Sequence, residues 1–126
     1  MKGAFLVSTS SHLFDTVTDV LVKLGGKYYP DDGAVQLRDE LGNLFTVFDN
    51  AEPADEYRSG PFTGAPGVEI PDLSVMFGVA VECRNEQYFA IATKTIAQAS
   101  DADVWVVDGD GVVWSAAKVD PAKVCL

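Results

Sequence analysis

The pattern of apolar and polar residues at the start of the chain predicts a strand followed by a helix. Residues Ala4 to Ser8 are a short apolar run, which is typical of a buried strand. Ser10 or Ser11 can then cap a helix, with Asp15 in its first turn. The pair Gly25-Gly26 predicts the end of this helix. Between cap and glycines, apolar residues recur at the spacing of one helix face: Leu13, Phe14, Val17, Leu21 and Leu24.

Strand patterns dominate the next segment. Lys27 to Pro30 is predicted to be a short extended piece, and Asp31-Asp32-Gly33 has the composition of a turn. The runs AVQLRD and NLFTVFD then alternate as strands do, on either side of residues 40–43. Two such runs joined by a short polar turn predict a β-hairpin.

A long interruption follows, over about residues 50–73. The stretch from Asn50 to Asp72 holds four prolines and three glycines but few aliphatic residues. It therefore predicts a long loop. Loops beyond about fifteen residues in a compact domain are uncommon and tend to be functional.

A strand, a helix and a second hairpin complete the pattern. Asn85 can cap the helix, and Val104–Val107 and Val112–Ser115 are predicted to pair as the hairpin. The C-terminal tail AAKVDPAKVCL is a candidate for one more short strand. The strand Val75–Cys83 is expected to point one face inward, made of Phe77, Val79, Val81 and Cys83. The buried stripe of the helix is expected to be Phe89, Ala92, Ile96 and Ala99.

Adjacent strands joined by short turns favour an α+β fold. We expect a single domain over residues 1–126, with a largely antiparallel sheet of about five to six strands packed with two helices. A chain of 126 residues is long enough to bury roughly two-thirds of its unfolded surface. The N-terminal run is expected to be a strand, because polar serines follow where a signal peptide would need its cleavage site. No apolar run approaches the roughly 18 residues of a membrane span.

The motif Asp108-Gly109-Asp110-Gly111 lies between two apolar runs and offers three interpretations. It is similar to the start of the nucleophile loop of haloacid dehalogenase-type phosphatases, but that loop needs a parallel strand and later motifs, and only fifteen residues follow here. A calcium loop needs oxygen ligands at its fifth and twelfth positions, where Val112 and Val119 stand. A glycine-rich turn of a hairpin remains, and we predict that.

Other catalytic patterns are weak. His12 is the one histidine and has Ser10 and Asp15 nearby, but neighbours at a helix start point in different directions, so we expect a polar surface histidine and no triad. Glu82 and Arg84 are expected to form a solvent-facing ion pair.

Metal and phosphate sites are not indicated either. The two cysteines and the histidine lack zinc-ligand spacing, and no glycine-rich phosphate loop occurs. We therefore expect no catalytic residue, no metal and no cofactor.

The net charge of −10 is the property that most limits which partners the protein can bind. Nineteen acidic residues stand against nine lysines and arginines. Binding to nucleic acid or to an anionic membrane depends on clustered cations, so neither partner is expected. A charged partner should be basic, although acidity also serves solubility alone. Cys83 lies inside a strand pattern and Cys125 near the end, so reduced thiols and a cytoplasmic location are expected.

The acidic residues concentrate in the middle third of the chain. Between Tyr28 and Cys83, eleven carboxylates face two arginines. Within this region, FDNAEPADEYRSGPF mixes carboxylates with the aromatic and arginine residues that are enriched at protein interfaces. The residues expected to contact a partner are Asp49, Glu52, Asp55, Glu56, Tyr57 and Arg58, with Asp31 and Asp32 as contributors.

The stretches LGGKYYPDD, GNLFTVFD, VAVECR and DVWVVDGDGVVW resemble those of small immunity proteins from bacterial polymorphic-toxin and contact-dependent inhibition systems. The shared character is that of a short, acidic α+β chain without a catalytic constellation. The resemblance implies a noncatalytic inhibitor that binds a cognate toxin domain, often a nuclease, inside the producing cell.

Two other classes of function remain open. A small-molecule-binding or regulatory domain predicts an unfilled apolar pocket near Phe45, Val47, Phe77 and Val79. A carboxylate-based hydrolase predicts acidic residues that converge in a cleft with raised pKa values.

Overall fold

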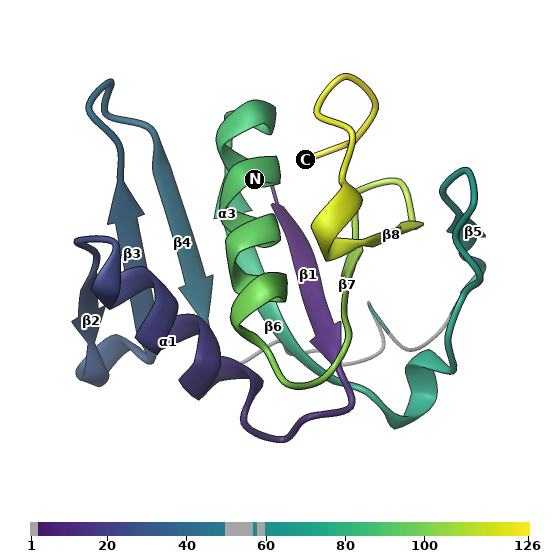
Figure 1. Cartoon of the computed structure of the whole chain (residues 1–126), viewed down its shortest axis with the longest axis horizontal. Helices are drawn as coiled ribbons and strands as arrows, with labels where there is room; N and C mark the ends of the chain where they lie inside the picture. Colours follow the sequence, from purple (N-terminus) through teal and green to yellow (C-terminus); the bar gives the residue numbers. More distant parts are fainter. Residues whose placement is uncertain (1–2, 50–56, 58–59) are drawn as a thin grey trace.

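An eight-stranded sheet forms the centre of the protein (Figure 1). The structure is a computed structural model and describes residues 3–49, 57 and 60–126. In chain order the elements are β1 (Gly3–Ser8), α1 (Leu13–Lys23), β2 (Lys27–Tyr29), β3 (Ala34–Arg38), β4 (Leu44–Phe48), β5 (Thr63–Gly64), β6 (Phe77–Cys83), α3 (Glu86–Ala99), β7 (Val104–Val107) and β8 (Val112–Ser115). Short 3-10 turns cover Pro30–Asp32, Leu73–Val75 and Ala116–Lys118.

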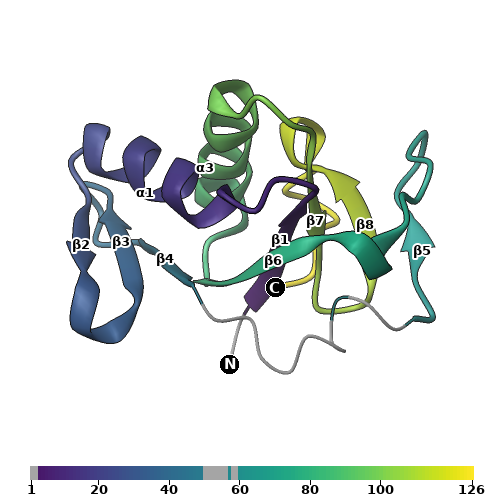
Figure 2. The same ribbon diagram turned by 90° about the horizontal axis from the view of Figure 1, so that it is seen from below.

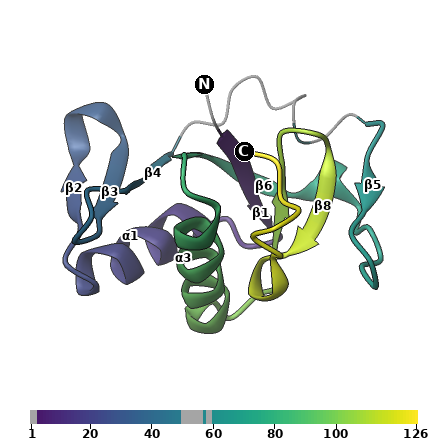
Figure 3. The ribbon, with the colours of Figure 1, turned by 90° about the horizontal axis from the view of Figure 1, so that it is seen from above.

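The strand order β2-β3-β4-β6-β1-β7-β8-β5 makes this an α+β fold, as the sequence predicts. Every pairing is antiparallel except that of β5 with β8. The sheet has more strands than the five to six expected. The extended piece at residues 27–29 pairs with β3, and the two residues of β5 pair at the opposite edge (Figure 3). The C-terminal tail adds no strand, and its first residues form a 3-10 turn instead.

Both helices lie on one face of the sheet and bury the main core against it (Figure 2). The inward residues of α1 are Leu13, Val17, Val20 and Leu21, and those of α3 are Phe89, Ala92, Thr93 and Ile96. The rings of Phe45 on β4 and Phe89 on α3 have centroids 5.9 Å apart. Leu24 and Ala99, expected in these stripes, are exposed because each stands at the end of its helix. Within the described residues, no helix combines the length and apolar character needed to cross a bilayer.

The helix ends follow local chemistry. At the end of α1, Gly26 donates its backbone N–H to Leu21 and Gly25 donates to Val22, the paired bonds of a Schellman motif. Gly25 has a φ of 101°, which glycine tolerates best. Asn85 caps α3 as expected, since its side chain accepts the Tyr88 backbone N–H at 2.9 Å.

The start of α1 differs from the expectation. His12, and neither Ser10 nor Ser11, is the cap residue, and no side chain accepts a capping hydrogen bond. The Ser10 hydroxyl instead accepts the backbone N–H of His12 within the preceding turn.

A second apolar cluster covers part of the other face of the sheet. It consists of Val7, Tyr57, Leu73, Met76, Val107 and Val113. The strand residues of this cluster belong to β1, β7 and β8, so it lies toward the β5 side of the sheet. Among the described residues, this face therefore has one half that the second apolar cluster covers and another half that neither α1, α3 nor this cluster covers.

Candidate functional site

Three of the predicted partner-binding carboxylates meet at one end of the sheet. Asp31 and Asp32 stand in the 3-10 turn before β3, which ends at Gly33 with a φ of 58°. Asp49 directly follows β4, and its backbone N–H donates to the Gly33 carbonyl at 2.8 Å. All three side chains are exposed, and among the described residues none of them has a hydrogen-bond or ion-pair partner. The β3–β4 hairpin therefore gathers them into one acidic corner, composed of Asp31, Asp32 and Asp49.

The rest of the predicted contact segment divides in two. Glu52, Asp55, Glu56 and Arg58 lie outside the described residues. Tyr57 differs from its expected role as a surface anchor, because it is 4% exposed. Its ring lies 5.5 Å from that of Phe5, centroid to centroid, and sits over Gly78. A side chain on residue 78 would come within 2.7 Å of the tyrosine ring, so the glycine makes room for it. Tyr57 thus belongs to the second apolar cluster.

A groove of about 760 Å³ opens on the face of the sheet opposite α1 and α3, beside the second apolar cluster. Its walls are the turn before β3 and the turn between β7 and β8. Apolar residues that line it are Ala4, Phe5, Phe48, Ala80, Val81 and Val107, and its carboxylates are Asp32, Glu82 and Asp108. No lysine, arginine or histidine is among the described residues that line it. We call this the helix-free groove.

The position of the groove corrects one expectation from the sequence. The alternative of a small-molecule-binding domain predicts an unfilled pocket near Phe45, Val47, Phe77 and Val79, but Phe45, Val47 and Val79 point toward the helices and are buried in the main core. Phe77, at the start of β6, is exposed. Phe77 and Val79 touch only a small hollow of about 180 Å³. The larger space lies on the opposite face, because the helices fill the predicted side.

Asp108 fixes the wall of the groove between β7 and β8. The turn predicted for Asp108–Gly111 is confirmed, with Gly111 at a φ of 76°. The Asp108 side chain is buried, and its Oδ1 accepts the backbone N–H groups of Asp110 and Val112, both at 2.9 Å. Its Oδ2 accepts the indole N–H of Trp114 at 3.0 Å and the backbone N–H of Cys125 at 3.1 Å.

Three of these bonds hold the hairpin itself, and the bond to Cys125 ties it to the C-terminal tail. The backbone N–H of Gly109 also donates to the Cys125 carbonyl at 2.7 Å. The sequence argument found the turn but missed this role of Asp108. The separation of 17 residues between Asp108 and Cys125 leaves no local pattern that could reveal it.

Glu82 and Arg84 do not form the ion pair expected of them. Glu82 lies on the helix-free face of β6 and is half-buried. Arg84 lies past the end of the strand, in the bend before α3, so strand alternation no longer aligns the two side chains. Both line an adjoining hollow of about 460 Å³ on the β3–β4 side. Among the described residues, the Glu82 carboxylate has no hydrogen-bond or ion-pair partner.

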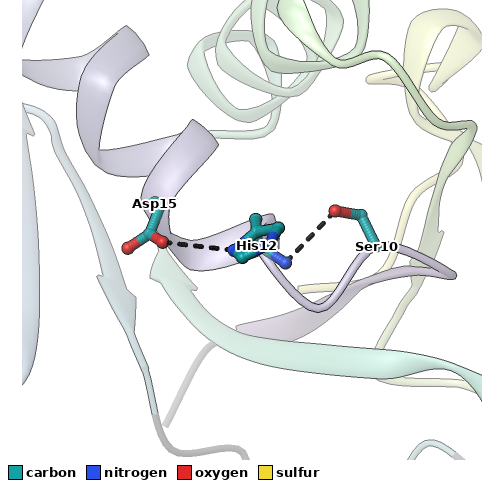
Figure 4. Close-up of polar contacts among 3 residues, drawn as sticks. All are labelled: Ser10, His12 and Asp15. Carbon is teal, nitrogen blue, oxygen red and sulfur yellow. Dashed lines mark hydrogen bonds and ion pairs between the residues drawn. The ribbon is translucent and has the colours of Figure 1, made fainter.

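The serine, histidine and aspartate at the start of α1 do not form a catalytic arrangement (Figure 4). The Ser10 Oγ accepts a hydrogen bond from the backbone N–H of His12, at 3.1 Å, so it does not contact the imidazole as a nucleophile would. His12 Nδ1 lies 3.7 Å from Asp15 Oδ2, and the two side chains are 79% and 80% exposed. His12 is therefore a polar surface histidine at the helix start, as predicted.

Three shifted pKa values have local structural causes. The Asn43 side chain donates to Asp39 and lowers the pKa of that carboxyl, and the backbone N–H groups of Asn43 and Leu41 act in the same direction. Burial raises the pKa of the Cys83 thiol and of the Tyr88 hydroxyl. Within the described part of the chain, no three His, Cys, Asp or Glu side chains are arranged to hold a metal ion.

No family model, no curated protein and no solved structure matches the chain. The described features that bear on function are therefore the acidic corner and the helix-free groove, which share Asp32.

Proposed function

We propose that this protein is a noncatalytic immunity-type inhibitor that binds and neutralises a basic toxin domain through its acidic face. One observation carries the proposal: the acidic corner has exposed carboxylates without partners among the described residues, and one of them, Asp32, lines a groove that has apolar walls and no cation among its described lining residues. A surface with both features suits a basic protein, because apolar contact supplies affinity and complementary charge supplies orientation.

The net charge of the whole chain also favours a basic partner. With a net charge of −10, the protein repels nucleic acid and attracts proteins that bind it. A nuclease presents cations to phosphate, and carboxylates placed over those cations would exclude the substrate. Electrostatic steering raises association rates above the ordinary range of about 10⁵–10⁶ M⁻¹s⁻¹. Fast capture matters for an inhibitor that must act in the cytoplasm of the cell that makes the toxin.

The test is co-expression of the tagged protein with the product of the neighbouring gene, followed by purification at low and at moderate salt. We expect a complex of equal stoichiometry with a basic protein, and we expect expression of this chain to relieve the toxicity of that protein. Purification of this chain alone at both salt concentrations, together with no relief of toxicity, would contradict the proposal.

A small-molecule-binding domain is the second candidate, and the size of the groove favours it. Ligand pockets typically enclose about 300–1,000 Å³, and the helix-free groove lies within that range at about 760 Å³. If the chain purifies alone, a thermal-shift screen of cationic and apolar metabolites becomes the informative experiment. A ligand that raises the melting temperature and loses this effect when Phe48 is replaced would favour this class.

A further inference from the structure

The register of the strands explains the apolar floor of the helix-free groove. Across neighbouring strands, Phe5 on β1 stands opposite Ala80 on β6, and Ala80 stands opposite Phe48 on β4. The small alanine side chain thus lies between two phenylalanines on the same face of the sheet. In the next row, Gly3 stands opposite Glu82 and contributes no side chain. The result is a low floor between aromatic flanks, with a carboxylate at its edge.

The carboxylates of the groove are not equivalent. The oxygens of Asp108 already accept four hydrogen bonds from N–H groups, so this residue supports the wall and has little capacity for a ligand. Asp32 and Glu82 accept none and form no ion pair within the described part of the chain. Arg84, the nearest described arginine to Glu82 in sequence, lines only the adjoining hollow.

Two available carboxylates beside aromatic and small apolar residues match one type of side chain well. Arginine and lysine lay their aliphatic stems along apolar surface while their charged ends reach polar groups. An arginine also stacks on aromatic faces and bonds carboxylates through a planar fork of donors. An acidic or neutral segment bound in the groove would cover the carboxylates of Asp32 and Glu82 without supplying an opposite charge. Covering an unpaired charge in this way costs free energy.

We infer that the helix-free groove is the docking site for a basic segment of the partner protein, which inserts an arginine or lysine side chain between Phe5 and Phe48. The charged end pairs with Glu82 and the stem covers Ala80, while a second basic residue of the segment pairs with Asp32, which lies on the other side of the row formed by Phe48, Ala80 and Phe5. This inference rests on the proposed function and names the surface that performs it. Because Asp32 belongs also to the acidic corner, the corner steers the basic segment toward the groove.

The experiment uses the full chain, isotope-labelled for NMR, and a short peptide of alternating arginine and leucine as the probe. We expect the peptide to shift the amide signals of Phe5, Phe48 and Ala80 at low salt. A peptide of alternating glutamate and leucine should cause no shift at these residues. The double variant D32N/E82Q should weaken binding of the basic peptide at least about tenfold, with an unchanged melting temperature. The matched control D19N/D103N removes the same charge from exposed sites elsewhere and should bind almost as the parent does.

The outcomes separate this inference from the proposed function. Absence of binding, signal shifts confined to other surfaces, or equal losses for the two double variants would overturn the groove as the docking site. A neighbouring toxin that still binds D32N/E82Q with parental affinity would also overturn it, while the inhibitory function would stand. Conversely, groove binding of the basic peptide without any toxin complex would support the site and contradict the inhibitor.

Discussion

A single carboxylate, Asp108, organises the part of the molecule where three separate segments meet. It bonds two backbone groups of its own turn, the indole of Trp114 on β8 and the backbone of Cys125 in the tail. Carboxylates are rarely buried unless their acceptor capacity is used, and here each oxygen accepts two N–H groups. The motif that looks catalytic in the sequence is therefore structural, and it shapes one wall of the helix-free groove.

Replacing Asp108 with alanine should destabilise the protein by roughly 3 kcal/mol, because the buried indole N–H of Trp114 is left without an acceptor, at about 1–3 kcal/mol, and three partly buried backbone donors lose theirs at a smaller cost. Urea unfolding followed by tryptophan fluorescence measures this change, since Trp114 reports on the site. Asp110→Asn, in the same turn but exposed, is the control and should change the stability by less than about 0.5 kcal/mol. Equal losses for the two variants would refute the structural role.

Asp39 should make stability depend on pH at acidic values. Its pKa is lower in the folded protein, so its contribution is fully present above the unfolded value of about 3.9 and is lost as the pH falls through the lower folded value. We expect Asp39→Asn to be less stable than the parent at pH above about 5 and to approach it as the pH falls below about 3. Glu40→Gln, its exposed neighbour, is the control. A difference between D39N and the parent that is independent of pH would contradict this assignment.

At the scale of elements, local chemistry decides how much the sequence can predict. Both helices, β1, β6 and the two hairpins follow from apolar spacing and turn residues, since these signals lie within each segment. β5 was missed because it has two residues and pairs with β8, far along the chain. The C-terminal tail was expected to add a strand but does not, because its apolar residues pack beside α3 and under the β7–β8 turn. The spacing of residues within the tail cannot predict these long-range contacts.

The fit of Tyr57 on Gly78 tests how the second apolar cluster is held on β6. Gly78→Ala should destabilise the protein by about 1–3 kcal/mol, because its methyl group would overlap the tyrosine ring. In a Tyr57→Ala background the same change should be nearly neutral, since the ring is gone. A double-mutant cycle by chemical denaturation measures this coupling. Additive effects would show that the ring does not rest on Gly78 in solution.

At the scale of the whole molecule, the candidate site combines predictable and unpredictable parts. The acidic corner follows from hairpin pairing, which places Asp49 beside the turn that carries Asp31 and Asp32. Prediction of the helix-free groove requires knowledge of which half of the sheet face the second apolar cluster covers, and this depends on where Tyr57 and Leu73 pack. Strand alternation predicts the face of the sheet on which Glu82 lies, but it does not predict the groove beside that residue.

The last prediction concerns the steering of the partner by charge. Reversal of Asp49, Glu52, Asp55 and Glu56 together to lysine should leave thermal unfolding nearly unchanged but slow association with the toxin domain by roughly tenfold or more at low salt. The salt dependence of the association rate should weaken as well, because fewer attractive charges remain to be screened.

The matched control reverses Asp19, Glu40, Asp101 and Asp103, which are exposed at sites away from the acidic corner. It alters the net charge by the same amount, so any effect of total charge appears equally in both variants. Stopped-flow association over a series of salt concentrations distinguishes them. A greater loss of rate in the first variant places the steering field at the segment from residue 49 to residue 56, whereas equal losses would assign it to the net charge alone and remove that segment from the interface.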